Sequence, residues 1–235
     1  MPSCWLQLAN RHAIVTGAGS GIGAMVTKAL REHGCHVTAT DVRKTSDPQV
    51  VMCDVSSEEE VCHLFKSYDA SSILINCAGI TRDSWIKDLH TDKDWKSVLD
   101  VNLTGTFLCC REFLNQEFSE TAAIVNVSSV VATQGNLGQS NYAASKGGVL
   151  SFSRSLAKEV AHRDIRVNCV VPGFIKTPMV STVPEKVQNM VRQRVALGKF
   201  GEAEDVANLI LFLASCKRSG YITGEAIECS GLITL

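Results

Sequence analysis

The sequence has no apolar run long enough to cross a bilayer, so we expect no membrane insertion. Its start, MPSCWLQLANRHAIVTG, lacks the apolar stretch and small-residue cleavage site of a secretion signal. The same segment lacks the arginine-rich amphipathic character of a mitochondrial presequence, although import without an obvious presequence stays open. We therefore expect an intracellular protein of the mitochondrial matrix or the cytoplasm.

A surplus of charge of one sign is also missing. The 235 residues carry 23 Lys and Arg against 24 Asp and Glu, with no basic tail and no acidic tract. Nucleic-acid binding, which needs clustered positive charge, is therefore not expected. The length suits one large α/β domain or two small ones and is ample for a hydrophobic core.

The ten cysteines include no C-x-x-C pair, the spacing that zinc sites and redox motifs use. His33 and His36 flank Cys35, but they straddle Gly34, which we expect to end a helix, so a metal site there is not predicted. Five of the ten cysteines stand in or beside apolar runs that are typical of buried strands. We therefore expect reduced thiols in an intracellular protein and no metal. The cysteines in or beside these runs are Cys35, Cys53, Cys77, Cys169 and Cys229.

Short β-branched runs alternate with longer helical patterns along the whole chain, which is typical of βαβ units around a buried parallel sheet. No repeat or linker interrupts this alternation, so we predict a single domain over residues 1–235 with seven strands in one sheet. The predicted strands are residues 12–16, 36–41, 50–54, 73–78, 123–128, 165–171 and 226–229. The predicted helices are residues 21–33, 57–67, 91–118, 141–162, 184–194 and 203–214.

One connection is too short for this scheme. Only VRKTSDPQ, residues 42–49, separates the second predicted strand from the third, whereas a helical crossover needs roughly a dozen residues. Pro48 would also break a helix there. We predict a non-helical crossover and a less well covered sheet edge on that side.

The first predicted strand runs into TGAGSGIG, residues 16–23, which opens a helix. Glycines at Gly17, Gly21 and Gly23 permit a tight turn and the close approach of a pyrophosphate to the helix N-terminus. A glycine-rich turn alone is weak support, because many such turns are structural. The strand before it and the helix after it favour a dinucleotide site.

Asp41 stands at the end of the second predicted strand, 18 residues beyond Gly23. A carboxylate there can accept hydrogen bonds from an adenosine ribose and would repel the extra phosphate of NADP, so NAD(H) is favoured over NADP(H). Arg43 competes with this interpretation, because a guanidinium could bind that phosphate. A turn residue that ends a strand is the structural alternative for Asp41.

Tyr142 and Lys146 lie four residues apart in QSNYAASKGG, so on a helix they share one face. That spacing fits either a surface pattern or a pair that handles a proton. A free phenol has a pKa near ~10, and a neighbouring ammonium favours its ionised form.

Six motifs, in order, resemble those of the short-chain dehydrogenase/reductase family across essentially the whole chain. They are TGAGSGIG, NCAG (residues 76–79), Asn102, SS (residues 128 and 129), YAASK (residues 142–146) and PGFIKT (residues 172–177). The resemblance implies a Rossmann-type, doubly wound fold and an NAD(P)-dependent enzyme acting on CH-OH and C=O groups. Within the family, SSVVATQGNLGQSNYAASKGG is similar to the β-ketoacyl-ACP reductases, and SGYITG with Asp41 to the 17β-hydroxysteroid dehydrogenases of type 8.

By this resemblance, Tyr142 donates the proton, and Lys146 tunes it and holds the nicotinamide ribose. Ser129, 13 residues before Tyr142, binds the substrate oxygen; Ser128 is the alternative, but alternation along a strand points it the other way. Asn102 resembles the asparagine that holds a water connecting Lys146 to solvent, with a locally bonded helix residue as the alternative.

The resemblance also assigns the cofactor contacts. Asp54 and Val55 would contact adenine, and the segment 180–200 falls where the family has a mobile substrate lid. Two departures are Cys77 in NCAG, in place of a commoner asparagine, and Ser230, where relatives often have glycine. The full predicted cofactor-binding set is Gly17, Ser20, Gly21, Ile22, Gly23, Asp41, Asp54, Val55, Asn76, Ala78, Gly79, Tyr142, Lys146, Pro172, Gly173, Ile175 and Thr177.

Three functions follow as hypotheses. The leading one is an NAD(H)-dependent oxidoreductase that interconverts a 3-oxoacyl thioester, of ACP or CoA, and its (3R)-hydroxyacyl form. The second keeps the chemistry but acts on a 17β-hydroxysteroid or another carbonyl. The third is mainly a dinucleotide-binding subunit of a hetero-oligomer. The resemblance implies a homotetramer, or a heterotetramer with a related carbonyl reductase.

Overall fold

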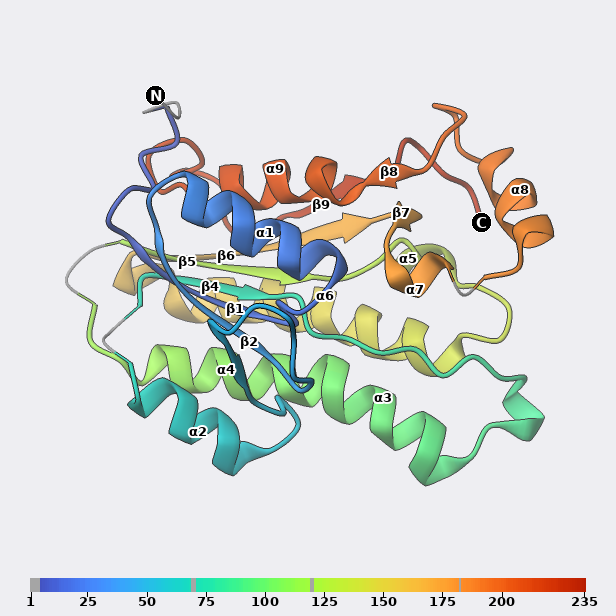
Figure 1. Cartoon of the computed structure of the whole chain (residues 1–235), viewed down its shortest axis with the longest axis horizontal. Helices are drawn as coiled ribbons and strands as arrows, with labels where there is room; N and C mark the ends of the chain where they lie inside the picture. Colours follow the sequence, from blue (N-terminus) through green and yellow to red (C-terminus); the bar gives the residue numbers. More distant parts are fainter. Residues whose placement is uncertain (1–4, 69–70, 119–120, 182) are drawn as a thin grey trace.

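The computed structural model describes residues 5–68, 71–118, 121–181 and 183–235. Seven parallel strands form one sheet in the order β3-β2-β1-β4-β5-β6-β9, with helices on both faces (Figure 1). The strand order reverses direction between β1 and β4, which is the doubly wound arrangement that the sequence predicted. The single-domain Rossmann-type fold with a seven-stranded parallel sheet is confirmed. Its strands are β1 (His12–Thr16), β2 (His36–Asp41), β3 (Val50–Met52), β4 (Ile73–Asn76), β5 (Ala122–Val127), β6 (Ile165–Pro172) and β9 (Ala226–Cys229).

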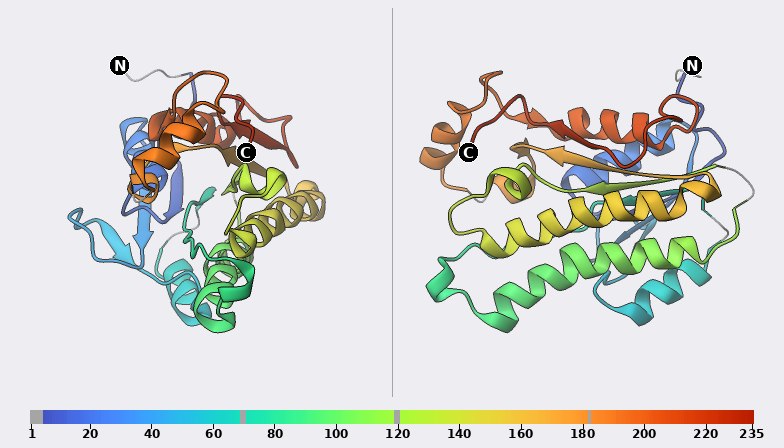
Figure 2. Two further views of the ribbon diagram at one scale, coloured as in Figure 1. Left: turned by 90° about the vertical axis from the view of Figure 1, so that its right-hand side faces the viewer. Right: turned by 180° about the vertical axis from the view of Figure 1, so that it is seen from behind.

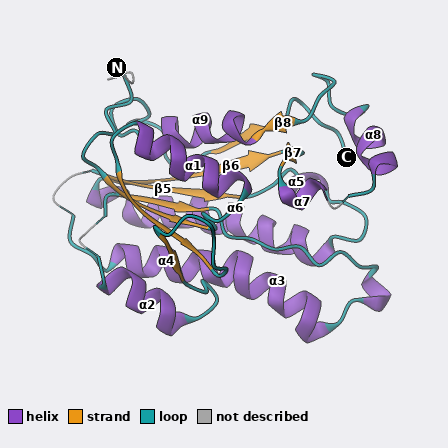
Figure 3. Ribbon diagram, viewed as in Figure 1, coloured by secondary structure: helices purple, strands orange, loops and turns teal. Residues whose placement is uncertain are grey.

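The helices form one layer on each face of the sheet, which is clearest when the strands are coloured apart from the helices (Figure 3). Helices α1 (Gly21–Glu32) and α9 (Ala203–Ala214) cover one face. Helices α2 (Glu58–Lys66), α4 (Gly105–Leu114) and α6 (Ser140–Val160) cover the other. Two views from other sides show the same layers (Figure 2).

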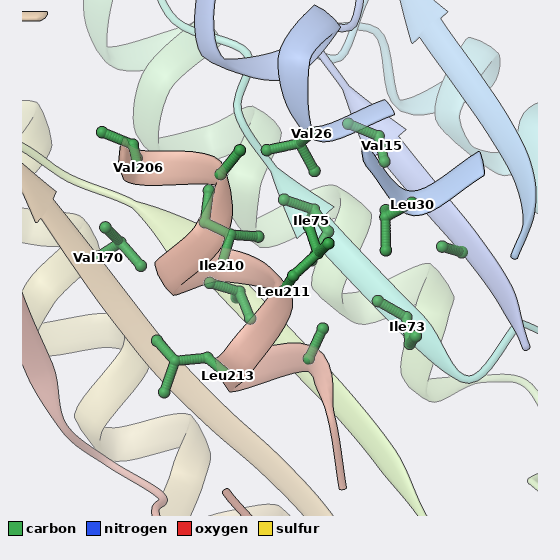
Figure 4. Packing of buried hydrophobic residues seen from close by; sticks show 14 of the residues in the cluster. Val15, Val26, Leu30, Ile73, Ile75, Val170, Val206, Ile210, Leu211 and Leu213 are labelled. Atoms are coloured by element: carbon green, nitrogen blue, oxygen red, sulfur yellow. The ribbon is translucent and has the colours of Figure 1, made fainter. Parts of the chain in front are cut away.

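The two hydrophobic cores follow from the alternation of side chains along each strand. In β1, Ala13 and Val15 point into the core beneath α1 and α9, whereas Ile14 points into the core beneath α2, α4 and α6. In the first core, Leu30 of α1 and Ile210 of α9 meet Ile75 of β4 (Figure 4). Because parallel strands are buried on both faces, their sequence shows continuous apolar runs.

The helix predicted for residues 91–118 begins at the predicted residue but ends at Leu114. It is continuous and contains two π-helical stretches, Thr91–Lys96 and Asp100–Thr104, before and after the short α3 (Ser97–Leu99), and then continues as α4. Figure 2 shows this helix beside α6. A π turn carries an extra residue and offsets the side chains that follow, and such turns are frequent at functional sites. Asn102 lies in the second π-helical stretch.

The connection between β2 and β3 is non-helical, as predicted. Asp47 in this connection accepts a hydrogen bond at 2.7 Å from Arg31 of α1, which ties it to the helix layer. The neighbouring edge strand is less well covered, since Met52 remains 63% exposed. Eight residues between the strands leave no room for a helix that would cover this edge.

Several short elements lie beyond the predicted set. They are β7 (Ile175–Lys176) and β8 (Gly201–Glu202), which pair with each other, the helices α5 (Val131–Gln134) and α7 (Pro178–Ser181), and two 3-10 turns at Ile86–Asp88 and Ala161–Arg163. The helix predicted at residues 184–194 is α8 (Glu185–Arg192). Among the residues that the structure describes, no helix is long and apolar enough to cross a membrane. The described part of the chain also holds no group of three or more His, Cys, Asp or Glu side chains placed to bind a metal.

Candidate active site

The candidate site lies where the carboxyl ends of neighbouring parallel strands meet. The register aligns Thr16 of β1 with Asn76 of β4, and Asn76 with Asn126 of β5. The loops that follow these strands therefore start side by side. In doubly wound sheets, this edge at the point where strand order reverses is where ligands bind.

The glycine loop between β1 and α1 is built so closely that side chains would not fit. A Cβ atom on Gly23 would lie 2.1 Å from the carbonyl oxygen of Gly17, and one on Gly17 would lie 2.7 Å from the backbone of Ala78. Gly17 also has a φ of 65°, which favours glycine. Ser20 precedes α1 without making a side-chain capping bond, so the first N–H groups of the helix are not capped by it. Such a loop fits a pyrophosphate.

Asp41 and Arg43, which the sequence set against each other, contact each other and the glycine loop. Asp41 is 5% exposed and accepts hydrogen bonds from the Gly19 N–H at 3.0 Å and from Arg43 Nε at 3.2 Å. Arg43 Nη2 donates to Ser20 Oγ at 3.0 Å. A carboxylate and a guanidinium are thus both present at the end of β2. The turn-residue alternative for Asp41 is insufficient, because this side chain bonds to a second loop.

The other residues predicted to contact adenine or to line the nucleotide cleft are held by bonds and packing within the protein. The Ala78 N–H donates to Thr16 Oγ1 at 3.2 Å, which joins the loops after β1 and β4. Asn76 points its Nδ2 at Asn126 Oδ1, 2.8 Å away, so its side chain supports the strand ends. Asp54 accepts two bonds from Ser56. Val55 is buried against α4, where a Cβ on the first residue of that helix would lie 2.8 Å away.

The loop after β6 meets the glycine loop. A Cβ on Gly21 would lie 3.2 Å from Thr177 Cγ2, so these two predicted cofactor contacts are neighbours. Pro172 ends β6, and the Gly173 N–H donates to the Cys229 carbonyl at 3.0 Å. Ile175 is buried in the core beneath α1 and α9. Ile22, the other predicted contact in this region, packs partly buried against the same core.

Ser129, Tyr142 and Lys146 come together at the end of β5. The hydroxyl of Ser129 is close enough to the phenol of Tyr142 to interact with it and to lower its pKa. The ammonium of Lys146 lies 5.9 Å from the centre of the Tyr142 ring and donates to the Val127 carbonyl at 2.8 Å. Ser128 points away and donates to the Lys146 carbonyl at 2.8 Å. The structure thus places Ser129, rather than Ser128, beside the phenol.

Burial shifts the pKa values of Tyr142 and Lys146. It raises the pKa of Tyr142 to about 12, with the hydrogen bond from Ser129 acting in the opposite direction. Burial also lowers the pKa of Lys146 to about 8. The pKa of Tyr142 therefore moves upward, opposite to the lowering by Lys146 that the sequence predicted. At neutral pH the phenol is protonated and can act as a proton donor.

Asn102 is fully buried and bonds to distant segments. Its Oδ1 accepts from the Ile80 N–H at 2.8 Å, and its Nδ2 donates to Ser145 Oγ at 3.0 Å. A Cβ on Gly79 would lie 3.4 Å from Asn102 Oδ1 and 3.3 Å from Lys146 Nζ. The local-bond alternative is therefore wrong: Asn102 joins the loop after β4 to α6 beside Lys146. Its predicted part in holding a water stays a prediction.

The segment predicted as a lid, residues 180–200, contains the end of α7 and all of α8; residue 182 lies outside the described residues. Its apolar side chains Met190 and Leu197 are 53% and 71% exposed. At its base, Val195 pairs with Ile233 in an antiparallel bridge, which seats the last residues of the chain beside this segment. Figure 1 shows the C-terminus next to α8. The departure noted at Ser230 lies just before this bridge, where its Oγ accepts from the Ile233 N–H at 3.3 Å.

The sequence did not predict a role for Asn141 and Gln139, which bond the segment before Tyr142 to the loop after β4. Asn141 is fully buried, accepts a bond from the Tyr142 N–H at 2.7 Å and donates to the Arg82 carbonyl at 2.9 Å. Gln139 donates to the carboxylate of Asp83. Their only signal in the sequence is that two amide residues, Gln139 and Asn141, stand within three residues before the tyrosine in QSNYAASKGG.

Comparison with known proteins agrees with this geometry. The family profile described as "Enoyl-(Acyl carrier protein) reductase" matches residues 17–231. A 3-oxoacyl-[acyl-carrier-protein] reductase FabG of Thermotoga maritima is 40% identical, over 96% of this chain and 98% of that protein. A (3R)-3-hydroxyacyl-CoA dehydrogenase of Rattus norvegicus is 39% identical, over 96% and 97%.

Similarity in three dimensions points the same way. The ligand-free aldohexose dehydrogenase of Thermoplasma acidophilum superposes with a TM-score of 0.88 at 28% identity, covering 96% of this chain and 94% of that one. The glycine loop, Ser129, Tyr142 and Lys146 follow one another in the order that the predicted family requires. With a profile match and relatives that span nearly its whole length, the chain belongs to the short-chain dehydrogenase/reductase family of oxidoreductases.

Proposed function

We propose that this protein is an NAD(H)-dependent oxidoreductase that interconverts a 3-oxoacyl thioester, of ACP or CoA, and its (3R)-hydroxyacyl form. The observation that carries the proposal is the contact between Ser129 and Tyr142, with Lys146 on the same helix face beside a loop that fits a pyrophosphate. Relatives named 3-oxoacyl-ACP reductase and (3R)-3-hydroxyacyl-CoA dehydrogenase, similar over nearly the whole chain, support this substrate class.

The glycine loop, Asp41 and the loop after β6 would hold the nicotinamide dinucleotide, which when bound supplies or accepts the hydride. The phenol of Tyr142 donates a proton to the carbonyl oxygen of the substrate during reduction. Ser129 donates a hydrogen bond to the same oxygen and stabilises the charge that develops there. In the reverse direction Tyr142 accepts the proton from the hydroxyl group.

Lys146 has two tasks in this proposal. Its ammonium lies beside the Tyr142 ring and favours the phenolate that proton donation leaves behind. Its Nζ also lies next to Gly79 and Asn102, where it can meet the nicotinamide ribose. Asn102, which joins Ile80 to Ser145, keeps the wall beside Nζ in place. The family resemblance and these contacts support both tasks.

Purified protein mixed with NADH and acetoacetyl-CoA is expected to oxidise NADH and to form (3R)-3-hydroxybutyryl-CoA. The measurement is the loss of NADH absorbance together with chiral analysis of the product. Parallel assays with estradiol and NAD test the 17β-hydroxysteroid alternative through the ratio of the two kcat/KM values. If acyl thioesters of short, medium and long chains all fail to react, the proposed substrate class is wrong.

We also propose a preference for NAD(H) over NADP(H), supported by the buried carboxylate of Asp41 at the end of β2. Asp41→Ala is expected to raise KM for NADH by about tenfold and to weaken the discrimination against NADPH, because charge-assisted bonds to the ribose contribute about 1.5–3 kcal/mol. The measurement is the ratio of kcat/KM for NADH and NADPH.

Arg43→Ala is the matched variant for this test, since it removes the competing cation and leaves the carboxylate in place. It is expected to lower the activity with NADPH more than the activity with NADH. A wild-type enzyme that already prefers NADPH would show that Arg43 decides the choice and that the proposal for Asp41 is wrong.

We further propose that the protein assembles as a homotetramer, or as a heterotetramer with a related carbonyl reductase. The outer face formed by the two long helices supports this proposal. Phe107 of α4 is 42% exposed and meets Phe152 of α6 edge to face at 6.3 Å, which leaves an aromatic pair on that face. Apolar surface of this kind is typical of subunit contacts.

A further inference from the structure

The loop that follows β4 is fastened to the start of α6 by a carboxylate. Gln139 Nε2 donates to both oxygens of Asp83, at 3.1 and 3.0 Å. Gln139 is itself held, since its Oε1 accepts from Asn136 Nδ2 at 2.8 Å. Thr81 Oγ1 also donates to the Asp83 carboxylate. Asp83 is exposed to solvent, yet its carboxylate accepts three hydrogen bonds, two from Gln139 and one from Thr81.

A second set of bonds joins the same loop to the same end of the helix. The Ser84 N–H donates to the Gly138 carbonyl at 2.9 Å. Asn141 Nδ2 donates to the Arg82 carbonyl at 2.9 Å, and its Oδ1 accepts from the Tyr142 N–H at 2.7 Å. Asn141 and Gln139, one and three residues before Tyr142, therefore hold the loop, and Asp83 is tied to this end of the helix.

Two charged groups, the Lys146 ammonium and the Asp83 carboxylate, act on the Tyr142 side chain. The ammonium of Lys146 lies 5.9 Å from the ring centre. The negative charge of Asp83 acts on the phenol from the loop and raises its pKa, in the same direction as burial. Two other charged residues lie close to this loop, and both have other partners. Arg82 Nη1 donates to the Thr81 carbonyl at 2.8 Å. Asp94 contacts Asn141 only through the Asp94 main-chain carbonyl, which accepts from Asn141 Nδ2 at 3.1 Å.

We propose that Asp83, held by Gln139, is a positioning residue for Tyr142: it fixes the loop after β4 against the start of α6 and keeps a negative charge at the end of the helix that carries the phenol. The charge opposes ionisation of the phenol, so it keeps Tyr142 protonated to higher pH and makes the phenolate that oxidation needs less available. The inference rests on the proposed role of Tyr142 as proton donor. It adds a residue whose carboxylate contacts Thr81 and Gln139.

Asp83→Asn tests the charge, because it keeps the shape and size of the side chain. Removing a negative charge lowers the pKa of Tyr142, and oxidation needs the phenolate. The pH limb of kcat for the oxidation of (3R)-3-hydroxybutyryl-CoA is therefore expected to move down by about half a pH unit, as for a solvent-screened charge. Below the limb this corresponds to about threefold faster oxidation. In about 1 M salt the shift is expected to shrink.

Two variants control for other effects. Asp88→Asn removes an equal charge from the same connection, where Asp88 pairs with Lys87 at 3.8 Å, and is expected to leave the limb in place. Asp83→Glu keeps the charge and is expected to restore most of the wild-type profile. An unmoved limb in Asp83→Asn, or an equal shift in Asp88→Asn, would overturn the proposal.

A measurement without turnover separates this inference from the proposed function. The chain has three tyrosines, so Tyr68→Phe with Tyr221→Phe leaves Tyr142 as the only phenol. After a stopped-flow jump to alkaline pH, phenolate absorbance near 295 nm reports its ionisation. Adding Asp83→Asn is expected to increase the phenolate fraction at a given pH. Equal fractions overturn the inference even if the enzyme reduces acyl thioesters; a higher fraction supports it even if no such turnover is found.

Discussion

Tyr142→Phe is expected to lower kcat for reduction of acetoacetyl-CoA by about 10²–10⁴-fold, the range that a positioned proton donor contributes. The substitution removes one oxygen atom, which bonds to Ser129, and leaves the aromatic ring against Lys146. The fold and the dinucleotide site are expected to be unchanged. The measurement is steady-state NADH oxidation at saturating substrate.

Two controls distinguish lost chemistry from lost structure. The affinity for NADH, measured by quenching of protein fluorescence, is expected to stay within about threefold of the wild type, because the glycine loop and Asp41 are untouched. Tyr221→Phe makes the same change at a fully exposed position and is expected to keep full activity. If Tyr142→Phe were as active as the wild type, the dinucleotide-binding-subunit hypothesis would gain and the role of Tyr142 would fall.

Gly23→Ala is expected to weaken dinucleotide binding by at least about tenfold and to lower Tm. Its Cβ would lie 2.1 Å from the carbonyl oxygen of Gly17, a contact that a packed structure cannot accept without moving the loop or the helix. Either movement displaces the N–H groups at the start of α1, which the pyrophosphate needs. Isothermal titration with NADH and thermal unfolding measure the two effects.

Gly147→Ala is the matched control for this prediction. Gly147 lies within α6, and a Cβ there would have its nearest neighbour, the Ala132 carbonyl, at an ordinary 3.7 Å. Because alanine favours helix over glycine, we expect the free energy of unfolding to rise by up to about 1 kcal/mol. Equal NADH affinities for Gly23→Ala and the wild type would contradict the cradle assigned to the glycine loop.

The architecture could be predicted because it depends on local patterns. Apolar runs such as HAIVT and ILIN are buried on both faces of a parallel sheet, and helical segments lie between them, so the runs alone give strand number and order along the chain. Chain length alone excluded a helix between β2 and β3. Two predicted ends were wrong: β3 ends at Met52 rather than residue 54, and the long helix ends at Leu114 rather than residue 118, because tertiary contacts decide where an element stops.

The candidate site could be predicted in part, since its residues stand in motifs of fixed spacing. The sequence placed Tyr142 and Lys146 on one helix face and favoured Ser129 over Ser128 by alternation, and the structure agrees with both. It could not give the pKa of Tyr142, because desolvation depends on which segments bury the ring. For the same reason the sequence could not show that burial would raise the pKa of Tyr142, opposite to the lowering expected from Lys146.

The sequence by itself determined the fold class, the glycine loop and the family, because each is written in short patterns of adjacent residues. Only the tertiary structure decided that Asn102 joins Ile80 to Ser145, that Asp41 and Arg43 bond to each other, and that Asp83 lies beside the start of α6. These contacts join residues that no local pattern relates, or depend on side-chain geometry that no pattern encodes. Packing of the loops after β1, β2 and β4 brings them together, and that packing sets the electrostatics of the site.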